Sequence, residues 1–215
     1  MLDEWQKRCL AFVSTRMDGD AAHDVSHVMR VVKNAIYLTD KENVNPWVTL
    51  PAAWLHDCVS VAKDSRQRSL ASRLAADRAR RFLAEAGYPA EHLDAVHHAI
   101  EAHSFSANVE ARSPEARVVQ DADRLEALGA IGIARCLLTA GSMGSALYAP
   151  DDPFCEARTP AEREFAIDHF YAKLLGLPET MQTRAGREEA RRRVEYMRGY
   201  LDELRGEIEG QFPVG

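Results

Sequence analysis

Apolar side chains recur at intervals of three and four residues along most of the chain, which is the spacing of one face of an α-helix. Short polar segments separate these stripes and predict turns. The approximate ranges of the predicted helices are 5–17, 24–38, 46–57, 69–86, 90–103, 114–135, 159–175 and 183–209. No run of alternating apolar and polar residues predicts a strand, although segments 104–110 and 144–150 leave room for a short hairpin. The pattern therefore predicts an all-α fold.

Several helix boundaries carry local signals. Asn45 is a typical N-cap residue, and Pro46 suits the first helical position. Thr159 and Glu162 have the spacing of a capping box and predict that a helix starts at this point. Glycine and proline are frequent between residues 139 and 158, where we expect a long, partly ordered loop.

The chain has 215 residues, a length that fits one domain or one domain with a small appendage. Its 46% hydrophobic and 28% charged residues are typical of a globular protein with a sizeable core. No segment approaches the roughly 20 apolar residues that a membrane span requires. The segment 1–10 carries acidic residues and lacks the apolar stretch of a secretory signal. We therefore expect a cytoplasmic protein with no membrane partner.

The net charge of −6 gives the surface no general attraction for the backbone of a polynucleotide. The basic runs 78–81 and 187–193 are accompanied by acidic residues and lack interleaved aromatic side chains, so they indicate solvated helix faces. The four cysteines lie far apart without a CxxC pair, which argues against a structural zinc site and against a disulfide framework.

His56 and Asp57 adjoin at the end of an otherwise apolar, tryptophan-rich helix. An imidazole and a carboxylate are costly to bury there unless both are paired or bound to a ligand. His27 lies one turn before Val31 on an apolar helix face, and two aspartates follow in the segment 120–125. Two imidazoles and two carboxylates suit a divalent ion such as Mn²⁺, Fe²⁺, Co²⁺ or Mg²⁺, with positions left for water and substrate.

The residues alone leave two alternatives open. A histidine beside an aspartate is more often a hydrogen-bonded pair or a helix-end cap than a metal ligand. The choice of aspartate is also ambiguous, because the apolar face of the predicted helix 114–135 includes Asp121, whereas Asp123 lies nearly opposite. Periodicity by itself selects Asp121.

The order of these residues resembles that of the HD superfamily of metal-dependent phosphohydrolases. Its pattern is a first histidine, an adjacent His-Asp pair and a later aspartate, matched here by His27, His56, Asp57 and Asp123. The likeness covers most of the chain, which resembles a small single-domain bacterial branch of the superfamily. The segments that carry it are HDVSHVMRVV, AAWLHDCVS, HHAIEAHSFSA, VVQDADRLEALGAIGIAR and HFYAKLLGLPETMQT.

The resemblance implies a compact helical HD-domain bundle formed by a single domain over residues 1–215. Its metal-binding core would span about 20–135, with C-terminal helices at about 159–210 packed on it. The superfamily pattern of an alanine-aspartate pair, a basic residue and leucine selects Asp123 as the last metal ligand. Asp121 would then be a buried hydrogen-bonding residue behind the ligands, and a ligand histidine is one candidate for its partner.

The sequence departs from the family pattern after the His-Asp pair. Some members place a glutamate there for proton transfer, but segment 58–64 contains none. The acid or base must then come from elsewhere, and Asp64 and His103 are the candidates. Lys63 could meet a substrate phosphate, although a solvated loop lysine explains it equally well.

Two further residues are expected at the same predicted pocket. His98 and Arg124 are candidate substrate contacts. We expect the other histidines to be surface or structural residues, namely His23, His92, His97 and His169.

The resemblance implies hydrolysis of a phosphoester or phosphoanhydride bond in a small phosphorylated substrate, with a nucleotide as the first choice. The rival hypothesis is a non-catalytic HD domain that senses a nucleotide or a metal ion. We expect no polynucleotide partner, and the sequence does not indicate an oligomeric state.

Overall fold

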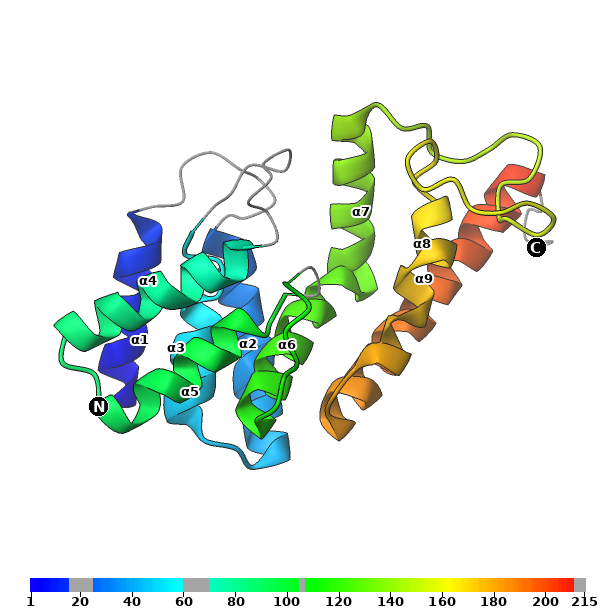
Figure 1. Ribbon diagram of the computed structural model, residues 1–215. Helices are drawn as coiled ribbons and strands as arrows, with labels where there is room; N and C mark the ends of the chain where they lie inside the picture. The colour runs from blue at the N-terminus through cyan, green and yellow to red at the C-terminus, as the bar shows by residue number, and fades with distance from the viewer. Residues whose placement is uncertain (16–24, 60–69, 105–106, 211–215) are drawn as a thin grey trace. The chain divides into compact units, whose positions relative to one another are not determined.

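The computed structural model describes residues 1–15, 25–59, 70–104 and 107–210 (Figure 1). These residues form an all-α protein, which confirms the predicted fold class. The α-helices are α1 (Leu2–Ser14), α2 (Val25–Glu42), α3 (Pro46–Leu55), α4 (Ala71–Glu85), α5 (Ala90–Glu101), α6 (Pro114–Arg124), α7 (Gly129–Met143), α8 (Asp168–Ala172) and α9 (Arg184–Glu209). The 3₁₀-helices are η3 (Leu125–Ala127) and η4 (Leu174–Thr180).

The chain divides into two compact units. The first contains residues 1–125 and 182–186, and the second contains residues 126–181 and the chain from 187 onward. The single domain expected over the whole chain stays a prediction.

Among the described residues no single helix is long and apolar enough to cross a membrane, and residues 114–127 and 129–143 meet that requirement only as a joined pair.

The first unit is organised around α3, which contacts α1, α2, α4, α5 and α6. Its residues 48–55 are all buried, as expected for a helix that is apolar on every side. Asn45 caps the helix as predicted, because its side chain accepts a hydrogen bond of 3.0 Å from the Trp47 amide. The core therefore surrounds the helix whose C-terminus leads into the His-Asp pair.

A proline inside α3 is compensated by a tyrosine from outside it. Pro51 has no N–H, so the helical hydrogen bond to the carbonyl of Trp47, four residues earlier, cannot form. The hydroxyl of Tyr88 donates to that carbonyl instead, at 2.5 Å. The partly buried carbonyl thus has a donor although position 51 of the helix cannot supply one.

The second unit has an apolar core and an ion pair between a partly exposed arginine and a buried aspartate. The guanidinium of Arg158 donates two hydrogen bonds of 2.5 and 2.7 Å to the carboxylate of Asp168, which is fully buried. The backbone amide of Ala161 donates to the same carboxylate at 2.6 Å. The largest fully buried apolar side chains of this unit are Leu128, Ile167, Phe170, Met181 and Met197.

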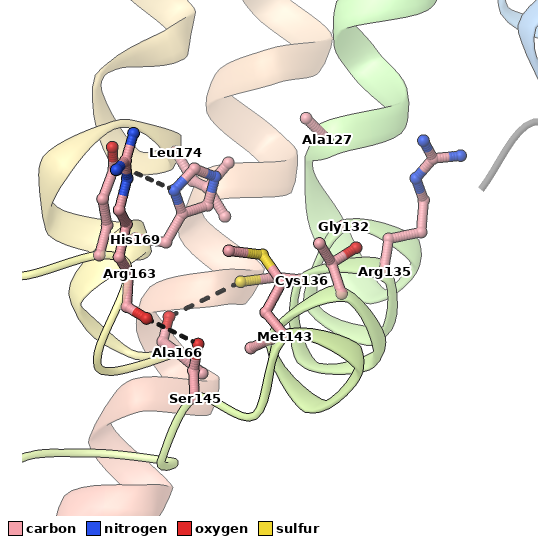
Figure 2. A pocket seen from close by; sticks show the side chains of 13 residues that line it. Ala127, Gly132, Arg135, Cys136, Met143, Ser145, Arg163, Ala166, His169 and Leu174 are labelled. Atoms are coloured by element: carbon pink, nitrogen blue, oxygen red, sulfur yellow. Dashed lines mark hydrogen bonds and ion pairs between the residues drawn. The ribbon is translucent and has the colours of Figure 1, made fainter. Parts of the chain in front are cut away.

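A cavity of about 370 Å³ opens in the second unit between α7 and residues 162–174 (Figure 2). Figure 2 shows the Cys136 thiol and the Met143 side chain on the α7 side, with Ala166 opposite. Cys136 Sγ donates to the Ala166 carbonyl at 3.7 Å, and burial raises the pKa of this thiol to about 11. A thiol that is protonated and hydrogen-bonded in this way is a packing residue. All thirteen lining residues belong to this unit.

The helix predicted over 114–135 is wrong as one continuous element. It ends at Arg124, passes through η3 and restarts at Gly129, whose φ of +70° favours glycine. A Cβ at Gly129 would also lie 3.3 Å from Cγ of Arg193. The helix then continues to Met143, beyond the predicted start of the loop at 139, and ends at Gly144 in the left-handed conformation.

The helix predicted from 159 is also wrong, because only the short α8 forms, at 168–172. The side chain of Glu162 does not close a capping box but binds Nδ1 of His169 at 2.8 Å. Segment 144–150 forms no hairpin, and within the described residues its one bridge is a parallel pairing of Ala146 with Phe165.

Candidate metal centre

Two residues of the centre come from helices that meet side by side, α2 and α6. His27 lies in the first turn of α2 and is 2% exposed. Asp123 lies near the end of α6, and its side chain is 30% exposed. His27 Nε2 is 3.5 Å from Asp123 Oδ1, so an imidazole and a carboxylate 96 positions apart in the sequence face each other.

His56 and Asp57 follow directly after α3. The ring of His56 is fully buried, and its Nδ1 is 2.8 Å from the Ala53 carbonyl, which accepts only from a protonated nitrogen. Its Nε2 therefore carries the lone pair in the neutral ring. Among the described residues this buried Nε2 has no hydrogen-bond partner. A buried ring nitrogen fixed in this tautomer is what a metal ligand requires.

The candidate ligand atoms converge from three places in the chain. Those of His27, His56 and Asp57 lie within 4.8 Å of one another. Asp123 Oδ1 is 3.8 Å from His56 Nε2, and Asp57 Oδ2 is 3.6 Å from the same nitrogen. Two neutral imidazoles and two carboxylates carry a charge of −2, which one divalent cation neutralises. The donor set and the unsatisfied His56 Nε2 both fit such an ion.

His103 joins this cluster from the C-terminal end of α5. It is 5% exposed, and its Nδ1 lies 2.6 Å from the Ile100 carbonyl. Its Nε2 is directed at Asp57 Oδ1, at 3.5 Å. The ring centroids of His56 and His103 are 4.9 Å apart at 83°. The carboxylate of Asp57 thus lies between two imidazoles.

The surroundings in the cluster shift the pKa values of His56 and His103 in opposite directions. Burial lowers the pKa of His56, and the neighbouring carboxylates do not overcome it, so the ring is neutral and can act as a ligand. Burial by itself would lower the pKa of His103, but the hydrogen bond and charge of Asp57, with the charge of Asp123, raise it. Burial by itself would raise the pKa of Asp123, but hydrogen bonding to His27 and the neighbouring histidines lower it to about 2.

The structure brings Asp123, not Asp121, beside His27 and His56. Asp121 is fully buried, as its place on the apolar stripe predicts, but its carboxylate accepts hydrogen bonds from the start of α9. These come from the Gln182 amide at 2.9 Å, the Thr183 amide at 2.8 Å and the Thr183 hydroxyl at 2.7 Å. Asp121 therefore supports a helix terminus, and among the described residues its hydrogen-bond donors include no histidine.

The other predicted contacts have different surroundings. Arg124 is half-buried in the last turn of α6, and burial lowers its pKa against the effect of Asp121 and Asp123. His98 Nε2 accepts a hydrogen bond of 3.2 Å from the Arg112 amide, and burial lowers the pKa of this imidazole.

Two of the histidines assigned to non-catalytic roles form hydrogen bonds with carboxylates. His97 lies 2.8 Å from Asp77, and His169 belongs to the second unit, paired with Glu162. His23, Lys63 and Asp64 lie outside the described residues.

Two amide side chains beside the cluster escaped the sequence analysis. Asn34 donates from α2 to the Ala122 carbonyl at 3.0 Å, and Gln120 donates from α6 to the Ala102 carbonyl at 2.8 Å. The available signal was a polar residue at a helical spacing from His27, because Asn34 follows it by seven positions. An amide is also common on solvated helix faces, so that signal alone is weak.

Comparisons with known proteins place the chain in a family and support its fold. The model of the HD domain family matches residues 24–128. The protein YpgQ of Bacillus subtilis is 34% identical over 197 residues, which cover 90% of this chain and 88% of that protein. Among solved structures, an HD-superfamily hydrolase from Bacillus thuringiensis has a TM-score of 0.77 and 33% identity, covering 98% of this chain and 100% of its own. A structure of Bacillus subtilis YpgQ in complex with ADP has a TM-score of 0.74 and 33% identity, covering 95% and 98%.

Proposed function

This chain belongs to the HD superfamily of hydrolases, and we propose that it is a phosphohydrolase that uses a divalent metal ion to cleave a phosphoester or phosphoanhydride bond in a small nucleotide. The observation that carries the proposal is the buried Nε2 of His56. This nitrogen has no hydrogen-bond partner among the described residues, and a second imidazole and two carboxylates converge on it. A site of this composition has no purpose in packing alone, because each of its groups is costly to bury.

The proposed ligands of the ion are His27, His56, Asp57 and Asp123, with Mn²⁺, Fe²⁺, Co²⁺ and Mg²⁺ as the candidate metals. When bound, a divalent ion polarises a phosphoryl oxygen and lowers the pKa of its bound water toward about 7. The protein contributes the orientation of the ligands. The bond from His56 Nδ1 to the Ala53 carbonyl fixes the ring so that Nε2 is the only available donor atom.

His103 is the proposed proton-transfer residue. Its Nδ1 is engaged by the Ile100 carbonyl, so any proton that it gains or loses is exchanged at Nε2. That nitrogen is directed at Asp57 Oδ1, and the carboxylate stabilises the protonated imidazole. His103 can therefore hold a proton next to the reacting phosphate and release it to the leaving oxygen.

Charge on the phosphate requires cationic partners. Arg124 follows Asp123 directly at the end of α6, and we propose that its guanidinium compensates the charge of the phosphoryl oxygens. Lys63 is proposed for the same task, and Asp64 as an alternative acid or base, from the segment after the His-Asp pair. His98 contacts a substrate only if it releases the Arg112 amide, so its proposed role is secondary.

A nucleotide is the proposed substrate because two independent considerations agree. The site combines imidazole and carboxylate donors, which suit a divalent ion, with a nearby arginine, which suits phosphate oxygens. The relative YpgQ, 33% identical over nearly its whole length, has been solved in complex with ADP. We therefore propose a nucleoside di- or triphosphate as the first substrates to examine.

The test compares wild-type protein with Asp57→Ala and His56→Ala. Metal content is measured by elemental analysis, and hydrolysis of a nucleotide panel is followed as release of phosphate or pyrophosphate with added Mn²⁺. Both variants should lose metal and turnover, whereas His97→Ala, which removes a surface imidazole paired with Asp77, should keep both. Full activity in Asp57→Ala would contradict the proposal. Nucleotide binding without turnover in wild-type protein would favour the rival sensing domain.

A further inference from the structure

We infer that two side-chain amides, those of Asn34 and Gln120, are positioning residues of the metal centre, each fixing a helix-terminal carbonyl one residue before a site residue. This inference rests on the proposed function for the meaning of the site. The contacts themselves belong to the first unit and span 88 and 18 positions of sequence.

Asn34 connects the two helices that supply His27 and Asp123. It follows His27 by seven positions on α2, which places both side chains on one face of the helix, two turns apart. Its Nδ2 donates to the carbonyl of Ala122 at 3.0 Å. Ala122 belongs to the last turn of α6, where carbonyls lack the intrahelical donors of the helix interior.

The consequence of this bond concerns Asp123, the next residue. The end of a helix frays unless its carbonyls find partners, and fraying at Ala122 would move Asp123 away from His27 and His56. Asn34 anchors this turn to α2, the helix that carries His27. One helix face therefore supplies a ligand and also sets the distance to the helix of the opposing ligand.

Gln120 acts in the same way on the other side of α6. It is 6% exposed, and its Nε2 donates to the Ala102 carbonyl at 2.8 Å. Ala102 is the C-cap of α5 and directly precedes His103. The His103 ring is itself bonded to Ile100 in that last turn. Gln120 thus anchors the turn whose geometry directs His103 Nε2 at Asp57.

Substitutions of Asn34 and Gln120 should therefore have different effects. Loss of the Asn34 donor loosens the approach of Asp123 to His27, which weakens metal binding. Loss of the Gln120 donor loosens the turn that orients His103, which leaves His27, His56, Asp57 and Asp123 in place. A purely structural role would produce the same loss of stability in both cases and no such division.

The experiment uses Asn34→Leu and Gln120→Met, which remove the donors and keep similar side-chain volume. Thr39→Val is the matched control, since Thr39 forms a buried 2.7 Å hydrogen bond with Thr49 in the same unit. The affinity for Mn²⁺ is measured by calorimetry on metal-free protein. The histidine ring ¹H–¹⁵N resonances are recorded on the same metal-free samples, and kcat is measured with a nucleotide substrate.

Asn34→Leu should weaken Mn²⁺ binding by about tenfold, the lower end of the usual effect of outer-shell partners. Gln120→Met should bind Mn²⁺ like wild type but show shifted His103 ring resonances and a reduced kcat. Thr39→Val should change neither affinity nor the His103 signals.

Outcomes that contradict the inference are distinct from those that contradict the proposed function. Wild-type affinity in Asn34→Leu, unchanged His103 resonances in Gln120→Met, or equal weakening of Mn²⁺ binding in all three variants would overturn the inference alone. A wild-type protein that binds no Mn²⁺ would overturn the proposed function, and the inference with it as a statement about a metal centre.

Discussion

The carboxylates of Asp121 and Asp123 leave the same helix on opposite faces and serve different neighbours. Two positions along an α-helix correspond to a rotation of about 200°. Asp121 accepts hydrogen bonds from Gln182 and Thr183 at the start of α9, whereas Asp123 faces His27 at 3.5 Å. A single turn of α6 thus contains both a residue that anchors the start of α9 and a proposed metal ligand.

This division predicts opposite phenotypes for two isosteric changes. Asp123→Asn should remove most bound metal, because a neutral amide is a poor ligand for a hard divalent ion. Asp121→Asn should retain metal but lower the free energy of unfolding by about 1–3 kcal/mol, because its amide group faces backbone donors. Elemental analysis and urea unfolding on both variants check this, and loss of metal in Asp121→Asn alone would reverse the assignment.

The contact between α6 and the start of α9 depends on Gly186. A Cβ at this position would overlap with Asp121 Oδ2 and lie 2.7 Å from Thr183 Oγ1. Gly186→Ala should therefore reduce the free energy of unfolding by about 1–3 kcal/mol through overpacking. Gly199→Ala in the same helix is the control, since nothing lies within 4 Å of its Cβ position. That variant should be more stable than wild type by about 0.5–1 kcal/mol, and a similar gain for Gly186→Ala would contradict the close approach.

The compensation of Pro51 by Tyr88 can be examined with a double-mutant cycle. Tyr88→Phe leaves the partly buried Trp47 carbonyl without this donor and should cost about 0.5–1.5 kcal/mol in urea unfolding. Pro51→Ala restores the N–H that the helix would direct at that carbonyl. The double variant should consequently be less destabilised than the sum of the single variants. Strict additivity would show that Tyr88 does not stand in for the missing amide.

The ion pair between Arg158 and the buried Asp168 predicts a pH dependence of stability. Burial by itself would raise the pKa of Asp168, but the hydrogen bonds from Arg158 and Ala161 lower it below the ordinary value of 3.8. A carboxyl whose folded pKa is depressed stabilises the protein above the unfolded pKa, and this contribution is lost as the pH falls toward the folded pKa.

Asp168→Asn should accordingly cost about 1–3 kcal/mol at pH 7, because it removes the charged acceptor of the hydrogen bonds from Arg158. The difference from wild type should stay constant down to about pH 5 and shrink below pH 3.8. Urea unfolding of both proteins at pH 7, 5 and 3.5 measures this. A difference that does not change with pH would show that the carboxyl is not ionised in the folded state.

Local chemistry was enough to predict several elements. The cap formed by Asn45 and Pro46 starts α3 as expected, and apolar spacing located α2 and α9 closely. The break at Gly129 was missed, because apolar spacing continues across it and the cause is a positive φ beside Arg193.

The capping box at Thr159 was misleading for a similar reason. Glu162 has a stronger partner in His169, and the Ala161 amide is taken by Asp168. Neither of these partners lies within one turn of the position that the local pattern describes.

The composition and order of the chain established the helical class and the kinds of donor in the candidate centre, because both follow from spacing and residue type. Periodicity selected Asp121 and the family pattern selected Asp123, and only folding in three dimensions showed which aspartate faces His27. Periodicity reports that a side chain is buried but not what it touches. It also decided the roles of Asn34 and Gln120. Their partners are single carbonyl groups that no residue pattern marks, and only the packing of helices distant in the chain brings donor and acceptor together.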